Sequence, residues 1–120
     1  MTKERMPVDR RSITQKIQIG DLEGYCIVGL YPDGRPGEVF LTFHKVGTVE
    51  RGLGNALAVM ISLALQRGVP VIDVVNKLKG MKFEPSGPTG NQSIPMADSI
   101  VDFVARWLEL RFCNKDAVHE

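Results

Sequence analysis

The sequence predicts an α+β fold in which an antiparallel β-meander of three or more strands packs on two or three C-terminal helices. The apolar residues alternate with a period of two up to about Lys45, which is typical of half-buried strands. From about Thr48 onward they recur at helical spacing instead. A run of strands followed by a run of helices is typical of a sheet with helices on one face.

The first strand is expected at 12–19, where isoleucines alternate with Thr14, Lys16 and Gln18. A more buried strand follows at 25–31. The turn at 32–37 contains Pro, Asp and Gly, which preset or tolerate turn dihedrals. A third strand at 38–45 alternates again, with an inner set of Val39, Leu41 and Phe43.

The first helix is predicted to begin at Thr48 as N-cap, with Glu50 in its first turn, and to stop at Gly68. Its expected inner face is formed by Leu53, Leu57, Met60, Ile61 and Ala64. Gly52 and Gly54 weaken a helix start. They indicate close approach by another backbone or a ligand, or else a loosely formed first turn.

A short second helix is expected from Pro70 to Gly80, and a last helix from Ser93 and Pro95 onward. The apolar face of the last helix consists of Met96, Ile100, Phe103, Val104, Trp107 and Leu108. Its polar stripe consists of Asp98, Asp102, Arg106 and Glu109.

At 120 residues the chain has the size of one domain. We expect a flexible N-terminal arm at 1–11, a single domain at 12–112 and a tail at 113–120. The formal net charge of +1 argues against a partner of long nucleic acid. No signal peptide is evident and no apolar run approaches membrane-spanning length, so the expected location is the cytoplasm, with no membrane partner.

The residues that could carry catalysis or hold a metal are few. Cys26 and Cys113 form no C-x-x-C pair, so neither a zinc site nor any cofactor is expected. His119 lies in the predicted tail, and His44 lies near a strand end as a surface or packing residue. Asp98 and Asp102 are one helical turn apart, a spacing usual on a solvated face. The sequence therefore predicts a chain that is not an enzyme.

The stretch at 82–91 combines an aromatic and a carboxylate with two glycines just before the expected last helix. Gly87 and Gly90 would let backbone N–H groups approach a phosphate. Phe83 could stack on a base, Glu84 could accept ribose hydroxyls, and Asn91 could read a base edge. The alternative is a rigid connection whose polar groups satisfy its own backbone. The candidate ligand-binding set is Phe83, Glu84, Ser86, Gly87, Thr89, Gly90, Asn91 and Arg106.

Arg106 lies about 16 Å along a helix that begins at Pro95, since each residue adds 1.5 Å. It would then meet the 82–91 stretch only across subunits, in a dimer or higher homo-oligomer. A surface ion pair with Asp102 is the alternative. Independently, Phe103, Trp107 and Phe112 offer aromatic area that a symmetric dimer could cover.

Seven segments, RRSIT (10–14), EGY (23–25), VGLY (28–31), RPGE (35–38), ALQRGVP (64–70), FEPSG (83–87) and SIVD (99–102), resemble in order one known region. This region is the C-terminal TSCPD domain of adenosylcobalamin (vitamin B12)-dependent ribonucleotide reductases. The reductase barrel and redox cysteine pair have no counterpart here, since Cys113 stands alone. The resemblance thus implies neither ribonucleotide reduction nor cobalamin binding, but a free-standing accessory or regulatory domain acting through contacts with a reductase.

The chain is also similar in size and element order to phage anti-Thoeris proteins, oligomers that sequester cyclic ADP-ribose-type signals. That similarity implies a non-catalytic nucleotide-binding module, with Phe83, Asn91 and Arg106 as its aromatic, amide and cationic contacts. A bacterial cell or a phage-infected host is the setting of these two hypotheses. The sequence favours the nucleotide-binding module, with the reductase accessory domain as the alternative, and leaves the identity of the nucleotide or cyclic nucleotide open.

Overall fold

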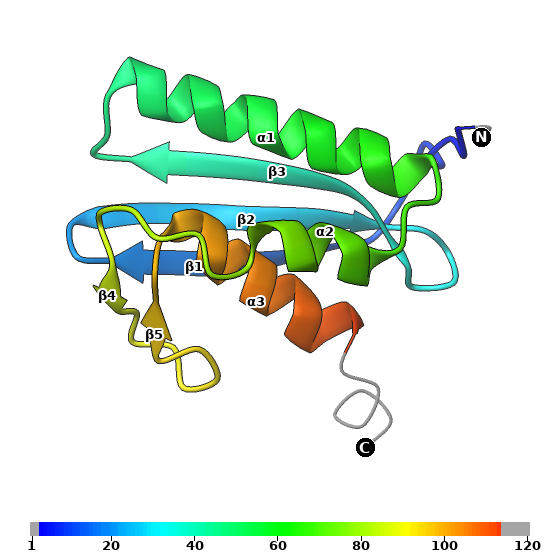
Figure 1. The fold of residues 1–120 in the computed structure, drawn as a ribbon. Coiled ribbons are helices and arrows are strands. Elements are labelled where there is room, and N and C mark those ends of the chain that lie inside the picture. The colour runs from blue at the N-terminus through cyan, green and yellow to red at the C-terminus, as the bar shows by residue number, and fades with distance from the viewer. Residues whose placement is uncertain (1–2, 114–120) are drawn as a thin grey trace.

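The computed structural model describes residues 3–113, and the predicted tail beyond Cys113, with His119, lies outside them. The chain has the predicted α+β architecture (Figure 1). Its elements are β1 (Ser12–Ile19), β2 (Leu22–Leu30), β3 (Pro36–His44), α1 (Thr48–Gln66), α2 (Val71–Leu78), β4 (Gly87–Pro88), β5 (Met96–Ala97) and α3 (Ile100–Phe112).

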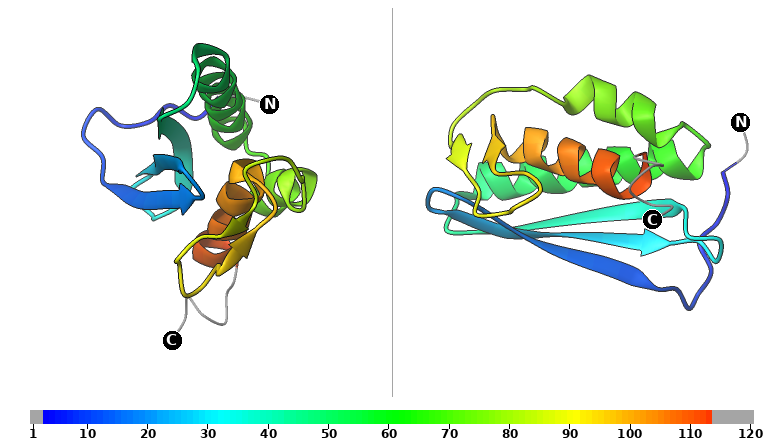
Figure 2. Two further views of the ribbon diagram at one scale, coloured as in Figure 1. Left: turned by 90° about the vertical axis from the view of Figure 1, so that its left-hand side faces the viewer. Right: turned by 90° about the horizontal axis from the view of Figure 1, so that it is seen from below.

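The strands β1, β2 and β3 form an antiparallel sheet in sequence order, as predicted. Alternation puts one set of apolar side chains on the face that the helices cover, and Ile17, Cys26 and Val39 are all at most 1% exposed. In Figure 2 all three helices lie on one side of the sheet. The opposite face is solvated and includes Phe40, whose exposed fraction is 47%. Such a one-sided arrangement is common in antiparallel sheets.

Helix α1 packs along β3 and also protects the free edge of this strand. Ser62 Oγ accepts a hydrogen bond from the Val39 N–H at 2.8 Å, and Gln66 Nε2 donates to the Gly37 carbonyl at 2.9 Å. These side chains pair backbone groups that a neighbouring strand would otherwise use. The edge of β3 is therefore closed by the helix.

Close approach is confirmed at Gly54, although the neighbour is a side chain and not a backbone or a ligand. A Cβ at this position would lie 2.3 Å from a ring carbon of Phe43. A Cβ on Gly52 would meet nothing within 4 Å. The two glycines consequently lie on opposite sides of α1, and only Gly54 is required by packing.

The prediction of which residues form the inner face of α1 is partly wrong. The residues buried against the sheet are Gly54, Ala58, Ile61 and Leu65, whereas Leu53 and Met60 are 66% and 59% exposed. The small side chains of Gly54 and Ala58 let the helix lie close to β3, which turns the larger residues outward. The N-cap is Gly47, with no side-chain cap, so Thr48 is the first helical residue and not the N-cap.

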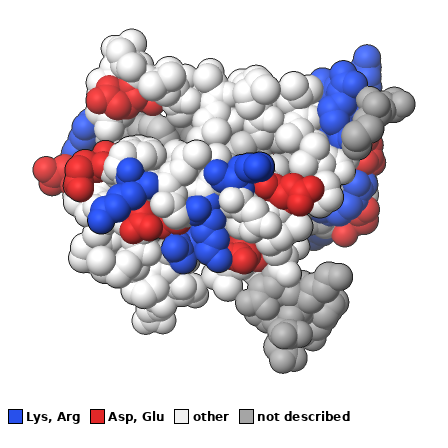
Figure 3. Space-filling model, in the orientation of Figure 1, with Lys and Arg blue, Asp and Glu red and all other residues white. Residues whose placement is uncertain are grey.

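The outward side of α1 is uncharged. Figure 3 shows the surface over α1 as white, with acidic atoms at one end and basic atoms at the other. Contrary to expectation, α1 is long and apolar enough to cross a membrane by length and composition, with a hydropathy of 1.2. A mostly buried core helix of a soluble protein meets the same criterion, but only 22% of the apolar window of α1 is buried, on the side that packs against β3.

Helix α3 begins at Ile100, later than the predicted start at Ser93 and Pro95. Residues 96–97 instead pair with 87–88 as the short ladder β5–β4, and Met96 is 59% exposed. Ser99 caps the helix by accepting the Asp102 N–H at 3.0 Å. The helix therefore begins where Ser99 can cap it, and Pro95 alone does not set the start.

The aromatic residues of α3 are covered within one chain. Phe103 and Trp107 are 1% and 3% exposed, and Trp107 also contacts Phe112 edge to face. The argument that a dimer is needed to cover them is therefore wrong. The largest group of exposed large hydrophobic side chains among the described residues lies on α1.

The segment predicted as a flexible arm is held along its described part. The Glu4 N–H donates to Gln66 O at 2.7 Å, and the Tyr31 hydroxyl donates to Glu4 O at 2.7 Å. Arg10 pairs with Glu38. The arm is thus attached to both α1 and the sheet.

Candidate functional site

The 82–91 stretch crosses from the end of α2 to the β4–β5 hairpin and lies beside the start of α3 (Figure 1). It is fixed to the α3 start by a hydrogen bond from the Phe83 N–H to Asp98 O at 3.1 Å. The ring of Phe83 is 45% exposed. The backbone is therefore anchored while the ring remains available for contact.

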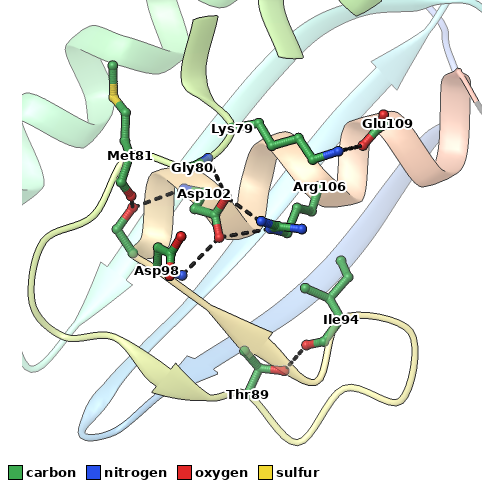
Figure 4. A network of polar contacts seen from close by, with 10 residues as sticks. Lys79, Gly80, Met81, Thr89, Ile94, Asp98, Asp102, Arg106 and Glu109 are labelled. Atoms are coloured by element: carbon green, nitrogen blue, oxygen red, sulfur yellow. Dashed lines mark hydrogen bonds and ion pairs between the residues drawn. The ribbon is translucent and has the colours of Figure 1, made fainter. Parts of the chain in front are cut away.

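A buried carboxylate organises the start of α3 (Figure 4). Asp102 is 0% exposed and accepts the Gly80 N–H at 2.6 Å and the Asp98 N–H at 2.8 Å. Arg106 Nε donates to both of its carboxylate oxygens, at 3.0 and 2.9 Å. One side chain thereby joins the end of α2, the end of β5 and the first turns of α3.

The surroundings of Asp102 act on its pKa in two directions. Burial disfavours the charged carboxylate, but the N–H groups of Asp98 and Gly80 and the guanidinium of Arg106 favour it. The favourable contacts outweigh burial, so the pKa of Asp102 lies below its ordinary value. The carboxylate is therefore ionised near neutral pH, which suits a structural anion better than a proton donor or acceptor.

Ser99 completes this network. Its hydroxyl donates to Met81 O at 2.6 Å while it caps α3. The predicted surface pairing of Asp102 with Arg106 is present, but the prediction of a solvated polar stripe missed that Asp102 is buried. The spacing Ser99-x-x-Asp102 matches a helix-start capping pattern and could have signalled the role.

The hairpin residues of the candidate ligand set bond mainly to their own loop. Thr89 Oγ1 donates to Ile94 O and accepts the Asn91 N–H. Asn91 Oδ1 accepts the N–H groups of Ser93 and Ile94 at 2.8 and 3.0 Å. Gly90 has a φ of +74°, a left-handed conformation that glycine adopts without strain. These contacts match the alternative of a self-satisfied connection.

Glu84 and Ser86 also contact each other. The Glu84 carboxylate accepts the Ser86 hydroxyl at 3.2 Å and the Ser86 N–H at 3.4 Å. Gly87 has a φ of +136°, and a Cβ there would meet nothing within 4 Å. Glu84 is exposed, so its carboxylate remains accessible to a partner.

Two cavities lie beside the candidate ligand-binding residues, and different members of this set line each cavity. The first, about 540 Å³, is lined by Arg106 and Glu109 of α3 together with Ser93, Ile94, Pro95 and Met96. The second, about 260 Å³, is an apolar crevice between α1, α3 and the sheet, with Phe83 and Glu84 at its lining. Gly87, Thr89, Gly90 and Asn91 line neither of these two cavities. Phe83 and Arg106 are therefore not brought together in one chain.

Arg106 lies nearer the start of α3 than expected, because the helix begins later than predicted. Arg106 is six residues beyond Ile100, about 9 Å along the helix and not 16 Å. It borders a cavity with the 93–96 segment of its own chain. A second subunit is consequently not required for Arg106 to meet that segment.

Other chemistry is limited in the part of the chain that the structure describes. Residues 3–113 contain no group of three or more His, Cys, Asp or Glu side chains that could hold a metal ion. His44 is exposed on the solvated sheet face, where its ring lies 6.2 Å from that of Tyr25. Burial raises the pKa of Cys26 to about 12, so its thiol stays protonated.

The fold and the site together define a small α+β domain whose buried polar groups hold the start of α3. The family profile of the TSCPD domain matches residues 2–112, so the chain belongs to the TSCPD domain family. The resemblance deduced from the seven segments is confirmed. No solved structure gives a significant match.

Several relatives of the chain are vitamin B12-dependent ribonucleotide reductases. The one from Rhodopirellula baltica is 47% identical over 112 residues, covering 93% of this chain and 11% of the relative. That from Bradyrhizobium diazoefficiens is 41% identical over 119 residues, covering 98% of this chain and 10% of the relative. That from Streptomyces avermitilis is 41% identical and is covered to 11%. The chain thus spans about a tenth of the length of these relatives.

Proposed function

We propose that this chain is a non-catalytic accessory domain that docks on a vitamin B12-dependent ribonucleotide reductase. The relationship to reductases supports the partner, because their TSCPD stretch is a small part of a much longer chain. The observation that carries the docking role is the apolar crevice beside the family segment FEPSG, at 83–87. Reductase contact at this crevice would be made through side chains and would need no chemistry from this domain.

The crevice suits a side chain better than a small-molecule ligand. Its volume of about 260 Å³ is below the usual range of ligand pockets, roughly 300–1,000 Å³. Its lining is apolar except for two carboxylates, and consists of Leu22, Leu41, Phe43, Val46, Glu50, Leu53, Gly54, Leu57, Phe83, Glu84, Pro85, Ile100, Val101 and Val104. An apolar or aromatic anchor of the partner would fill this space, as anchors do at the centre of interfaces.

The two carboxylates at the crevice favour a positively charged partner. Glu50 and Glu84 approach the crevice from α1 and from the FEPSG segment, and both residues are exposed. A basic side chain next to the apolar anchor would meet them favourably and would speed the encounter. The expected docking segment of the reductase is therefore an apolar or aromatic residue flanked by Lys or Arg.

The direct test uses the Rhodopirellula baltica reductase with its own TSCPD stretch removed. Titration calorimetry should detect binding of this chain, and Phe83→Ala should weaken it at least tenfold. Phe40→Ala is the matched control, because Phe40 is 47% exposed against 45% for Phe83 but lies on the solvated sheet face. No binding, or equal loss from both variants, would reject the docking role.

The Arg106 cavity favours a second candidate, nucleotide binding, which includes sequestration of a cyclic ADP-ribose-type signal. Its volume of about 540 Å³ is within the usual ligand range. The Arg106 side chain is 39% exposed and uses only Nε to bond Asp102 among the described residues, so its terminal nitrogens could meet a phosphate. Glu109, which also lines the cavity, is paired with Lys79 at 2.7 Å.

A single-chain nucleotide site would differ from the set expected from sequence. A base would lie on Ile94 and Met96 beside Arg106, and Phe83, with Asn91, would stay outside. Thermal unfolding with adenine nucleotides and cyclic ADP-ribose isomers tests this. A ligand-induced rise in Tm should survive Phe83→Ala and be lost in Arg106→Lys. If the nucleotide panel leaves the Tm unchanged, the second candidate is rejected while reductase docking is unaffected.

A further inference from the structure

The side of α1 that faces away from the sheet is apolar along its whole length. Its exposed large side chains are Val49, Leu53, Val59, Met60 and Leu63, with exposed fractions of 70, 66, 57, 59 and 41%. From 52 to 66 the helix contains no charged residue. A surface helix normally presents charged and polar residues on this side. A face of this composition indicates a surface that is covered in the working protein.

The outward residues are spaced for helix–helix packing. Positions 49, 52, 53, 56, 59, 60 and 63 repeat as a, d and e of successive heptads. They span a stripe of about 120° centred on Ala56, opposite Gly54, Ala58, Ile61 and Leu65, which face the sheet. The outward stripe, defined as these seven positions, is therefore a second complete packing face.

The outward stripe is nearly symmetric about Ala56. Val49 and Leu63 lie seven residues to either side of it, and Gly52 and Met60 lie four residues to either side. In an antiparallel pair related by a two-fold axis at Ala56, Met60 of each helix would face Gly52 of the other. A side chain at Gly52 would meet nothing within 4 Å, so this space is open to receive Met60.

We propose that the outward stripe is the interface of a two-fold dimer, in which two copies of α1 pack antiparallel and cross at Ala56. The occupant is a second copy because the stripe complements itself, as an isologous interface requires. The antiparallel arrangement also lets the two helix dipoles oppose each other.

The size of the apolar surface fits a dimer. Nineteen residues give α1 a length of about 28 Å, and a groove between α1 and α2 extends the surface past Met60 toward Val74 and Leu78. A stable dimer buries roughly 800 Å² per partner, so the interface needs this flank in addition to the helix pair. The dimer goes beyond the proposed docking role and leaves Phe83 and Glu84 outside the outward stripe, although Leu53 borders both surfaces.

Cysteine cross-linking tests the geometry. Helices 8–10 Å apart, each of radius about 2.3 Å, bring two Ala56 Cα atoms to about 3.4–5.4 Å, which overlaps the range of disulfides. In a Cys113→Ser background, Ala56→Cys should form a disulfide dimer on mild oxidation. Val49→Cys is the matched control, since two copies of residue 49 would lie about 21 Å apart. Equal cross-linking of both variants would overturn the proposal, and so would the absence of a disulfide dimer in both.

Light scattering tests the association without oxidation. The native chain should have the mass of a dimer at micromolar concentration, and Met60→Glu should shift it to a monomer. Val8→Glu is the control for surface charge, because Val8 is 95% exposed and is not part of the outward stripe. A monomeric native chain would overturn the proposal. So would a monomer that associates with phosphatidylcholine vesicles or that uses the outward stripe to bind a reductase.

Discussion

The buried carboxylate of Asp102 holds the half-exposed guanidinium of Arg106 at 2.9 Å while accepting two backbone N–H groups. The pair has the i,i+4 spacing of a surface ion pair, but one partner is completely buried. Its main effect is to fasten the segment before α3 to the end of α2. The crevice and the Arg106 cavity both depend on this segment for their shape.

Replacing Asp102 with Asn should lower the free energy of unfolding by about 2–3 kcal/mol. The amide loses the charge that pairs with Arg106, and its NH₂ group cannot satisfy both backbone donors. Urea denaturation measures the change. Asp73→Asn on the exposed part of α2 is the control and should alter stability by less than about 0.5 kcal/mol. Equal effects would contradict the role of the network.

The same carboxylate should make stability sensitive to acid. Because the folded pKa of Asp102 is lower than the unfolded value, the native state binds its proton less readily. Its contribution is therefore complete above the ordinary Asp pKa, about 3.9, and is lost as pH falls through the folded value. The stability difference between the native chain and Asp102→Asn should be constant near neutral pH and shrink below about pH 4. A difference that grows with acid would contradict this assignment.

Two neighbouring glycines of α1 should respond oppositely to alanine. Gly54→Ala would press a methyl group on the Phe43 ring and should cost about 1–3 kcal/mol. In the monomeric Met60→Glu background, Gly52→Ala enters open space and should stabilise the helix by up to about 1 kcal/mol. Thermal unfolding of both variants provides the comparison. Destabilisation of similar size in both would show that α1 does not pack on β3 through Gly54.

The thiol of Cys26 should be unreactive in the folded protein. It is 1% exposed, and burial raises its pKa to about 12. Iodoacetamide at pH 8 should therefore leave Cys26 unmodified for hours, while urea-unfolded protein should react at both cysteines. Peptide mass spectrometry distinguishes the sites. Rapid modification of Cys26 in native buffer would contradict the burial.

Sequence periodicity was sufficient for the sheet and for the existence of three helices, because alternation and helical spacing are local signals. It failed at the inner face of α1, since the close approach at Gly54 depends on Phe43 from a strand distant in sequence. It also failed at the start of α3, because Ser99 and Pro95 are both residues typical of a helix start. The helix begins after Ser99 because Ser99 caps it and because residues 96–97 pair in the β4–β5 ladder.

The candidate site was only partly predictable for the same reason. The FEPSG segment was found from composition and family resemblance, and Phe83 does border a crevice. The separation of Phe83 from Arg106 within one chain was expected, but from a helix start at Pro95, whereas α3 begins at Ile100. The buried state of Asp102 depends on Gly80 and Asp98 N–H groups, whose positions follow from tertiary structure.

The most direct test of the account is the affinity of this chain for a vitamin B12-dependent ribonucleotide reductase without its own TSCPD stretch. We expect binding that is weakened by Phe83→Ala and by Glu84→Lys and is unchanged by Phe40→Ala. Charge reversal at Glu84 should act most strongly at low salt, because exposed charges are screened as ionic strength rises. The absence of binding at low salt, or binding that is insensitive to Phe83 and Glu84, would contradict the central claim.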